Sequence, residues 1–294
     1  IHENYISSGI SGFSNLTNQI ITLEDGDYGW IDSNEIKLYN LGKEVNRKLE
    51  TIDINDTTVD KGTFEHFMLK EIFDQPDVVK RTLTEYTDNN KVVLPKFSFD
   101  LSKLERLTIV ACGTSYYAGC MVKYFFEKIA KVKIDIDIAS EFRYRDTPLD
   151  KNGVALFISQ SGETADTIGA LKYCKEHGQK IISLVNVFQS TIASLSDVVL
   201  KTFAGAEIGV ASTKAFTAQV LVLSLLGLEI ARLKGIIDNE YFKNFLNEVK
   251  KLPEMIEKVL SQKDNISRIS ENLKKAEFVI YLGRGIYYPA ALES

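Results

Sequence analysis

Residues 154–164 read VALFISQSGET, an uninterrupted apolar run that passes into a turn of hydroxyl, amide and glycine residues. An apolar run without polar alternation is typical of a strand that is buried on both faces, as in a parallel sheet. The residues from there to His177 continue at helical spacing. This stretch therefore predicts one strand–loop–helix unit of an α/β domain.

The same order of elements recurs on both sides of this unit. Upstream, residues 107–111 form a second apolar run that leads through Cys112-Gly113-Thr114-Ser115 into a helical stretch over residues 116–130. Further strands are predicted at residues 132–139, 181–185 and 198–203. Strands that alternate with helices indicate an α/β fold with a doubly wound parallel sheet, helices on both faces and a flavodoxin-like plan.

The N-terminal residues differ in character. Residues 19–23 and 35–39 alternate like short strands, with turn residues between them. Such a ribbon cannot bury a face alone, so we expect a short β-rich remnant of an upstream domain, followed by a polar linker at 51–62. The expected division is 1–59 for this remnant and linker, 60–240 for the sheet domain, and 241–294 for connecting helices and a truncated second unit.

The flanks of the sheet domain are predicted to be helical. A helix is expected over residues 64–72, with Pro76 opening a second short helix. Beyond Gly235 an amphipathic helix is expected, which Pro253 breaks or kinks. Residues 278–282, FVIYL, repeat the signature of a buried strand and predict the start of a second α/β unit.

The composition limits the possible functions. The chain has 294 residues, 45% of them apolar and 26% charged, and a formal charge of −5, which leaves no basic excess for nucleic acid. Its three cysteines form no CxxC pair, so neither a disulfide framework nor a metal site is predicted. Residues 1–4 do not resemble a signal peptide, and the apolar stretch 215–231 is predicted to be a core helix rather than a membrane span. A reducing cytoplasm fits this pattern.

The turns after the two apolar strands are the candidate site. In an open parallel sheet, ligands bind outside the carboxyl ends of strands, where helix N-termini present unpaired amides. Gly162 lets the backbone approach a ligand, and hydroxyl and amide side chains donate to phosphate or sugar oxygens. The donors of this first turn are Ser159, Gln160, Ser161 and Thr164. The alternative is that Ser161 only caps the following helix.

The turn at 112–115 repeats this arrangement one strand earlier. A nucleophilic role for Cys112 is possible, but a cysteine that ends a buried strand usually serves packing. A third loop, at residues 207–214, carries Lys214, which reaches either a phosphate or Glu207. Residues 141–145 place two arginines among aromatic residues, a pattern more typical of a structural ion-pair network than of an anion site. The three histidines are scattered, and none is assigned to catalysis.

These loops, in this order, resemble the sugar-isomerase (SIS) domain family, and most closely its members that transfer nitrogen from glutamine to fructose 6-phosphate. The segments that carry the resemblance are 60–62, 67–72, 111–115, 139–145, 159–167, 207–217, 282–285, 288–289 and 291–293. The resemblance implies that residues 23–27 end a glutaminase domain, that residues 60–240 are a first SIS domain, and that residues 241–294 begin a second one.

The resemblance also implies an activity and its residues. It implies conversion of fructose 6-phosphate and glutamine into glucosamine 6-phosphate and glutamate, without metal or cofactor, in a cytoplasmic homodimer. The implied substrate-binding residues are Cys112, Gly113, Thr114, Ser115, Ser159, Gln160, Ser161, Thr164, Val210 and Ser212. Glu293 matches an acidic residue near the reacting carbons, and a carboxylate there suits proton transfer between C1 and C2.

The resemblance has limits. The family's glutaminase uses an N-terminal cysteine as its nucleophile, whereas this sequence begins with Ile1. The family's principal base, ring-opening histidine and Schiff-base lysine are expected at positions beyond Ser294. We therefore expect sugar-phosphate binding without full activity, with ammonia coming from a glutaminase domain. The alternatives are a sugar-phosphate-sensing SIS module of a regulator, which the absence of a basic recognition helix disfavours, and a purely structural dimerisation domain.

Overall fold

A computed structural model describes residues 3–7, 16–51 and 61–294. The chain divides into two compact units, residues 1–63 and residues 64–294. The predicted linker at 51–62 lies for most of its length outside the described residues. Each unit is considered by itself.

The N-terminal unit consists of short antiparallel strands. β1 (Gln19–Ile21) pairs with β5 (Leu49–Thr51), and β2 (Asp27–Ile31), β3 (Ile36–Asn40) and β4 (Lys43–Val45) form a three-stranded sheet. The predictions for β1 and β3 are confirmed, but β2 was missed. Its glycine, Gly29, hides the strand pattern, yet it is required because a Cβ there would lie 2.0 Å from the carbonyl oxygen of Lys37 on β3.

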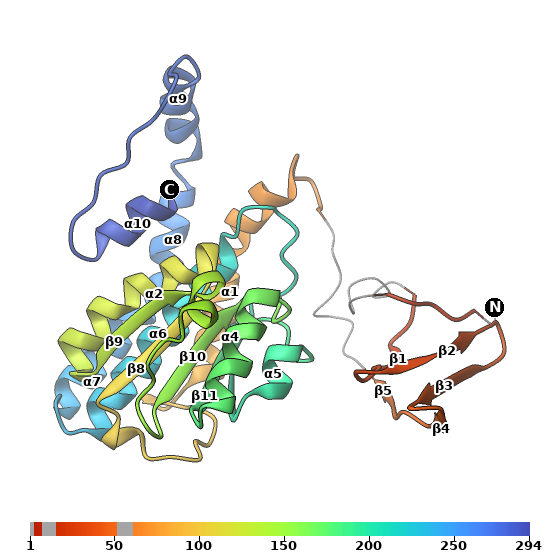
Figure 1. Cartoon of the computed structure of the whole chain (residues 1–294). Helices are drawn as coiled ribbons and strands as arrows, with labels where there is room; N and C mark the ends of the chain where they lie inside the picture. The colour runs from red at the N-terminus through yellow and green to blue at the C-terminus, as the bar shows by residue number, and fades with distance from the viewer. Residues whose placement is uncertain (1–2, 8–15, 52–60) are drawn as a thin grey trace. The chain divides into compact units, whose positions relative to one another are not determined.

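The second unit contains the predicted parallel sheet. Its strands are β8 (Arg106–Ala111), β9 (Lys133–Ile138), β10 (Val154–Ser159), β11 (Lys180–Val185) and β12 (Val198–Lys201). They lie in the order β12-β11-β10-β8-β9 and all pair in parallel (Figure 1). The predicted doubly wound, flavodoxin-like fold is confirmed, with the strand order reversing between β8 and β10.

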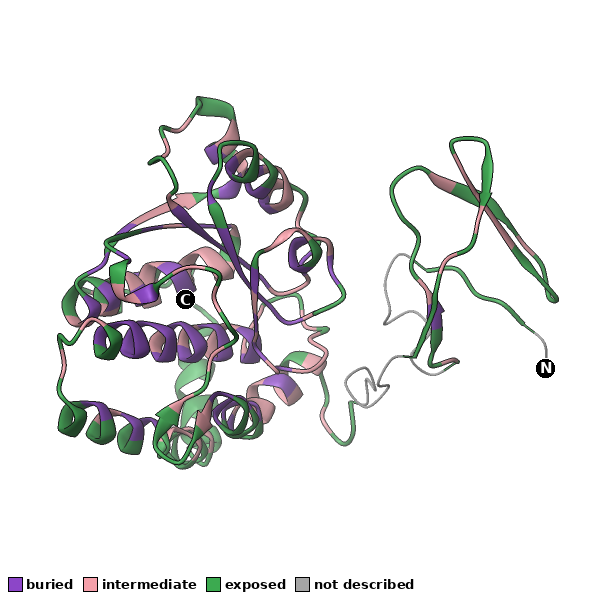
Figure 2. Ribbon diagram, turned by 90° about the horizontal axis from the view of Figure 1, so that it is seen from below, coloured by how far each residue is buried: buried purple, intermediate pink, exposed green. Residues whose placement is uncertain are grey.

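Helices cover both faces of this sheet (Figure 2). One face packs against α1 (Phe67–Tyr86), α2 (Gly113–Phe125), α6 (Lys214–Leu233) and α7 (Asn239–Val249). The other face packs against α3 (Ala139–Phe142), α4 (Ala165–Glu176) and α5 (Thr191–Leu195). Leu156 on β10 faces the first core and Phe157 the second, and neither has exposed surface, which explains the unbroken apolar run of this strand.

Helix α6 is long and apolar enough to cross a membrane by length and composition, but 67% of that window is buried inside the protein. Most of its side chains pack in the core between α1 and α2. The prediction of a core helix at 215–231 is therefore confirmed.

Helix α1 differs from the prediction, because Pro76 lies inside one continuous helix of 20 residues instead of opening a second one. Proline removes the backbone donor that would bind the carbonyl of Ile72. The side-chain amide of Gln75 donates to that carbonyl instead, at 3.1 Å. A neighbouring side chain therefore replaces the missing hydrogen bond.

The same helix closes the β12 edge of the sheet. Arg81 Nε donates to the carbonyl of Phe203, and Thr82 Oγ1 donates to the carbonyl of Thr202. The Tyr86 hydroxyl accepts a hydrogen bond from the amide of Lys201 at 2.8 Å and donates one to the carbonyl of Lys201 at 3.0 Å. Burial raises the pKa of Tyr86 to about 12, so the phenol keeps its proton at physiological pH. The backbone groups of an edge strand are thus used inside the molecule.

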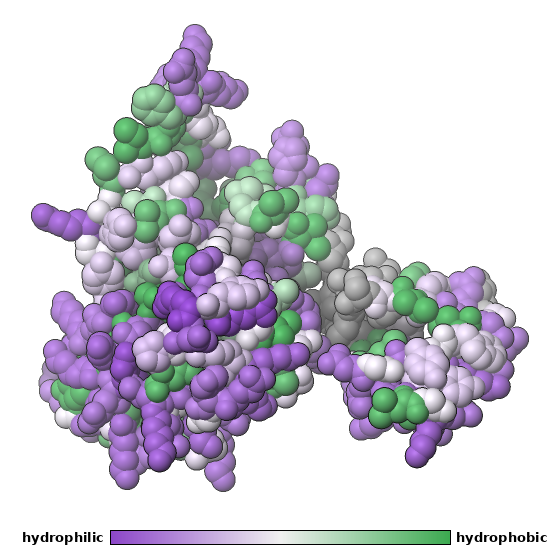
Figure 3. Space-filling view, viewed as in Figure 1, coloured by the Kyte–Doolittle hydropathy of each residue, from purple (hydrophilic) through white to green (hydrophobic). Residues whose placement is uncertain are grey.

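The C-terminal segment brings one correction. Helices α8 (Leu252–Leu260), α9 (Lys263–Leu273) and α10 (Tyr287–Glu293) are present. The expected break at Pro253 is confirmed, because α7 ends at Val249 and Pro253 lies in the first turn of α8. Residues 278–282, predicted as a buried strand, form no strand and are exposed, with Leu282 at 90%. A strand needs hydrogen-bonding neighbours, and the described sheet places none beside this segment. Exposed apolar side chains also gather on α8 and α9 (Figure 3).

Candidate sugar-phosphate site

The candidate site lies where the strand order of the sheet reverses. β10 pairs with β8 in parallel register, with Ile158 opposite Ala111, so both strands end at the same edge. The turn that follows β10 and the N-terminus of α2 that follows β8 therefore lie side by side. In doubly wound sheets this position between reversed neighbours is where ligands bind. The sheet topology brings together the hydroxyl residues of the two predicted loops.

Within the 159–164 turn, the hydroxyl groups organise the backbone. Ser159 Oγ accepts a hydrogen bond from the amide of Gly162 at 3.0 Å and lies 3.1 Å from Thr164 Oγ1. Ser161 Oγ accepts from the amide of Glu163 at 3.2 Å. Because a hydroxyl that accepts one bond keeps its proton, Ser161 can still donate to an anion.

The alternative role of Ser161 as a helix cap does not match this geometry. Helix α4 begins at Ala165, its N-cap residue is Thr164, and it has no side-chain cap. Ser161 stands three residues earlier and bonds inside the turn. The free amides of the first turn of α4 and the partial positive charge of the helix end therefore remain available to a ligand.

The turn rests on the connection between β11 and α5. Gly162 has a φ of +68° and its carbonyl accepts from the amide of Ile192 at 3.0 Å. A Cβ on Gly162 would lie 2.0 Å from Ser190 Oγ, so a side chain has no room there. Glu163 Oε1 accepts from the amide of Thr191 at 2.6 Å, and the amide of Asn186 donates to the carbonyl of Gln160. These contacts fix the turn on the side of β11 and α5, while Gln160, Ser161 and Thr164 keep part of their surface exposed.

The second loop brings in two distant side chains. Thr114 Oγ1 donates to Glu293 Oε1 at 2.7 Å, because α10 packs on α2. Ser115 Oγ accepts from Gln219 Nε2 at 3.0 Å. Gln219 is 1% exposed and was not predicted as part of the site; its signal in the sequence was a polar interruption of an apolar helix. The structure therefore places the predicted Glu293 against the predicted Thr114.

Cys112 is the N-cap residue of α2 and half buried. Its neighbour Gly113 has a φ of +54°, which glycine tolerates and which turns the chain from strand into helix. Among the described residues there is no group of three or more His, Cys, Asp or Glu side chains that could hold a metal ion. Cys112 therefore belongs to no such group among the residues that the structure describes.

In the third loop, residues 207–213, the expected pairing of Lys214 with Glu207 does not occur. Glu207 accepts from Ser212 Oγ at 2.8 Å and from the amides of Thr213 and Ala215, so it caps α6. Lys214 pairs with Asp74 of α1 at 3.2 Å instead of with Glu207. Val210 stands fully exposed at the tip of the loop.

The two arginines of segment 141–145 contact residues outside the hydroxyl loops. Arg145 pairs with Asp137 on β9, and Arg143 stacks on the ring of Tyr144 at 4.6 Å. These contacts agree with a structural role.

Close to the second loop, burial raises the pKa of Tyr116 to about 12, with the hydrogen bond to Cys120 as a further cause, so this phenol stays neutral.

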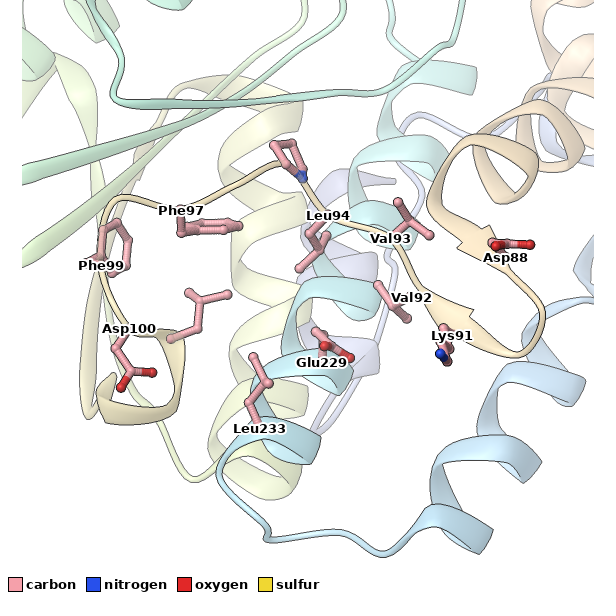
Figure 4. A pocket seen from close by; sticks show the side chains of 12 residues that line it. Asp88, Lys91, Val92, Val93, Leu94, Phe97, Phe99, Asp100, Glu229 and Leu233 are labelled. Atoms are coloured by element: carbon pink, nitrogen blue, oxygen red, sulfur yellow. The ribbon is translucent and has the colours of Figure 1, made fainter.

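A separate hollow of about 520 Å³ lies at the other end of the unit (Figure 4). Phe97, Phe99 and Leu94 point into it, together with Leu233 from the last turn of α6. It adjoins the segment that leads into β8, so it lies at the amino ends of the strands, away from the hydroxyl loops.

The comparisons with known proteins agree with this geometry. A family model described as the SIS domain matches residues 100–228. The "C-terminal domain of glucosamine-fructose-6-phosphate aminotransferase" from Francisella tularensis is 40% identical with a TM-score of 0.77, covering 80% of this chain and 67% of that one. The chain belongs to this aminotransferase family of SIS-domain proteins.

Two further relatives define the extent of the match. The glutamine–fructose-6-phosphate aminotransferase of Brucella abortus is 45% identical over an alignment of 294 positions that covers 99% of this chain and 48% of that protein. The glucosamine-6-phosphate deaminase of Thermotoga maritima is 26% identical with a TM-score of 0.57, covering 78% of this chain and 65% of that one. The chain thus spans about half the length of the curated aminotransferases it matches.

Proposed function

We propose that the unit of residues 64–294 binds fructose 6-phosphate and is the sugar-binding part of an enzyme that makes glucosamine 6-phosphate from this sugar and glutamine. The observation that carries the proposal is the meeting of two hydroxyl-bearing turns at the β8–β10 switch point. One turn leads into α4 and the other into α2, so two helix N-termini converge on the same place. This arrangement suits a small dianion.

The chemistry of the proposed site follows from its donors. The hydroxyls of Ser159, Ser161 and Thr164, the Gln160 amide and the free amides of α4 would hold the phosphate. Thr114 and Ser115 would contact the sugar from α2, and Val210 and Ser212 would line the cleft from the third loop. Fixed dipoles of this kind bind a dianion without reorganising, which preserves affinity.

Glu293 has the catalytic part in this proposal. Moving a proton between C1 and C2 of an open-chain sugar requires a carboxylate that accepts and returns the proton. The hydrogen bond from Thr114 orients the Glu293 carboxylate toward the α2 loop. Because the chain spans about half of its relatives, we propose that it binds the sugar but does not complete the reaction alone. In this proposal a glutaminase domain supplies the nitrogen as ammonia, and the protein acts as a homodimer in the cytoplasm.

A thermal titration with fructose 6-phosphate tests this function. A ligand at about 100 times its Kd stabilises the folded state by about 2.7 kcal/mol, which for a unit of this size raises Tm by roughly 5 °C or more. Fructose, which lacks the phosphate, serves as the control and is expected to shift Tm by less than about 1 °C. Equal shifts with both sugars, or none with either, would contradict the proposal.

A further inference from the structure

The buried carboxylate of Glu71 holds a loop that lies 137 residues downstream. Glu71 is on the first turns of α1 and is 2% exposed. Its Oε1 accepts from the amide of Ile208 at 2.5 Å, and both of its oxygens lie 3.1 Å from the amide of Gly209. A carboxylate that accepts two adjacent backbone amides fixes the direction of both peptide planes.

The loop is shaped to admit this carboxylate. A Cβ on Gly209 would lie 2.5 Å from Glu71 Oε2 and 3.4 Å from the Cα of Met68. The backbone of the loop therefore approaches α1 more closely than any residue with a side chain would allow. Glu71 and Gly209 form a matched pair, in which the absence of one side chain makes room for the other.

Two more residues on the same face of α1 hold the end of this loop. Asp74 pairs with Lys214 at 3.2 Å, and Gln75 Oε1 accepts from Thr217 Oγ1 at 2.6 Å. Positions 71, 74 and 75 share one helical face because they are three and four residues apart. Of the three, Glu71 bonds to the loop itself, while the other two bond to the first turn of α6.

We propose that Glu71 is a positioning residue for sugar binding: it sets the place of Val210 and Ser212 at the site without touching the ligand. This inference rests on the proposed function, since it assumes that the third loop lines the sugar site. Gly209 directly precedes Val210, so a change in the direction of the Gly209 peptide plane moves Val210 at the tip of the loop. The 159–164 turn has no such dependence, because its contacts come from β11 and α5.

This difference between the loops gives a selective test. In Glu71→Gln the side chain keeps one acceptor oxygen, but its NH2 group takes the place of the other oxygen that lies 3.1 Å from the Gly209 amide. A donor then faces a donor at Gly209, which weakens the hold on the loop. The affinity for fructose 6-phosphate is expected to fall roughly tenfold. The affinity for inorganic phosphate, which needs the 159–164 turn alone, is expected to stay within about twofold, whereas general destabilisation would weaken both.

The measurements are isothermal titration with both ligands and hydrogen exchange of the backbone amides. Exchange at Ile208 and Gly209 should rise by at least about tenfold, while β8 and β10 stay protected. Gly209→Ala approaches the same contact from the loop side and should give the same pattern. Glu85→Gln, an exposed position on α1 with the same change of charge, should match the unaltered chain.

The outcomes separate this inference from the proposed function. If the unaltered chain binds fructose 6-phosphate and Glu71→Gln binds it equally well, the role of Glu71 is overturned while the function stands. Unchanged exchange at Ile208 and Gly209 in both variants would also overturn it. If the unaltered chain binds inorganic phosphate but not the sugar phosphate, the proposed function fails, and the binding role of Glu71 fails with it.

Discussion

Gly162→Ala is expected to abolish sugar-phosphate binding and to destabilise the 64–294 unit by about 3 kcal/mol. An alanine at a φ of +68° costs roughly 1–2 kcal/mol, because its Cβ crowds the following carbonyl. A further cost arises because that Cβ would lie 2.0 Å from Ser190 Oγ. Relief of this clash requires the turn to leave α5, which separates Ser159 and Ser161 from the geometry that binds the phosphate.

The matched control is Gly178→Ala. Gly178 has a φ of +74°, but a Cβ there would meet no atom within 4 Å. It should therefore show the backbone cost of roughly 1–2 kcal/mol without any loss of ligand affinity. Urea unfolding and titration with fructose 6-phosphate measure both quantities. Equal stability losses in the two variants would show that contact with Ser190 does not hold the turn.

Asp74→Ala is expected to cost about 2–3 kcal/mol of stability. Asp74 pairs with Lys214 at 3.2 Å and with Lys70 at 2.7 Å, and the side chain of Lys214 is only 6% exposed. Removing the carboxylate leaves a buried ammonium group without compensation, which is more costly than losing the pair as a whole. The partial exposure of Asp74 lowers the expected cost below that of a fully buried pair.

A second substitution tests this cause. Lys214→Met in the Asp74→Ala background removes the uncompensated charge and keeps an apolar chain of similar length in the same place. The double variant is therefore expected to recover at least about half of the lost stability in urea unfolding. A double variant that is less stable than Asp74→Ala alone would show that packing of the lysine, and not its charge, determines the effect.

The sheet could be predicted from the sequence because its strands are buried on both faces. The run 154–158 contains no polar residue and the run 107–111 contains only Thr108, and each is followed by a turn with glycine and hydroxyl residues. Hence the strands, the loops and the carboxyl edge at which they meet all follow from local patterns. The strand order, which places β8 beside β10, depends on long-range packing and came from the structure.

Contacts between distant segments lie outside such patterns. Glu71 meets Gly209, Gln219 meets Ser115 and Lys214 meets Asp74, each across more than 100 residues. Residues 278–282 show the opposite case, in which a strong local pattern has no neighbouring strand in the described sheet. Pro76 was misjudged because a side chain, Gln75, compensates for the missing backbone donor. Local propensity decides an element only when its surroundings agree.

The most direct test of the central claim is a crystal structure of the chain grown with saturating fructose 6-phosphate. The account predicts a phosphate group about 3 Å from Ser161 Oγ and from amides at the start of α4, with the sugar reaching toward Thr114 and Glu293. A sugar phosphate bound elsewhere, such as in the hollow beside Phe97 and Phe99, or no bound ligand at that concentration, would contradict it.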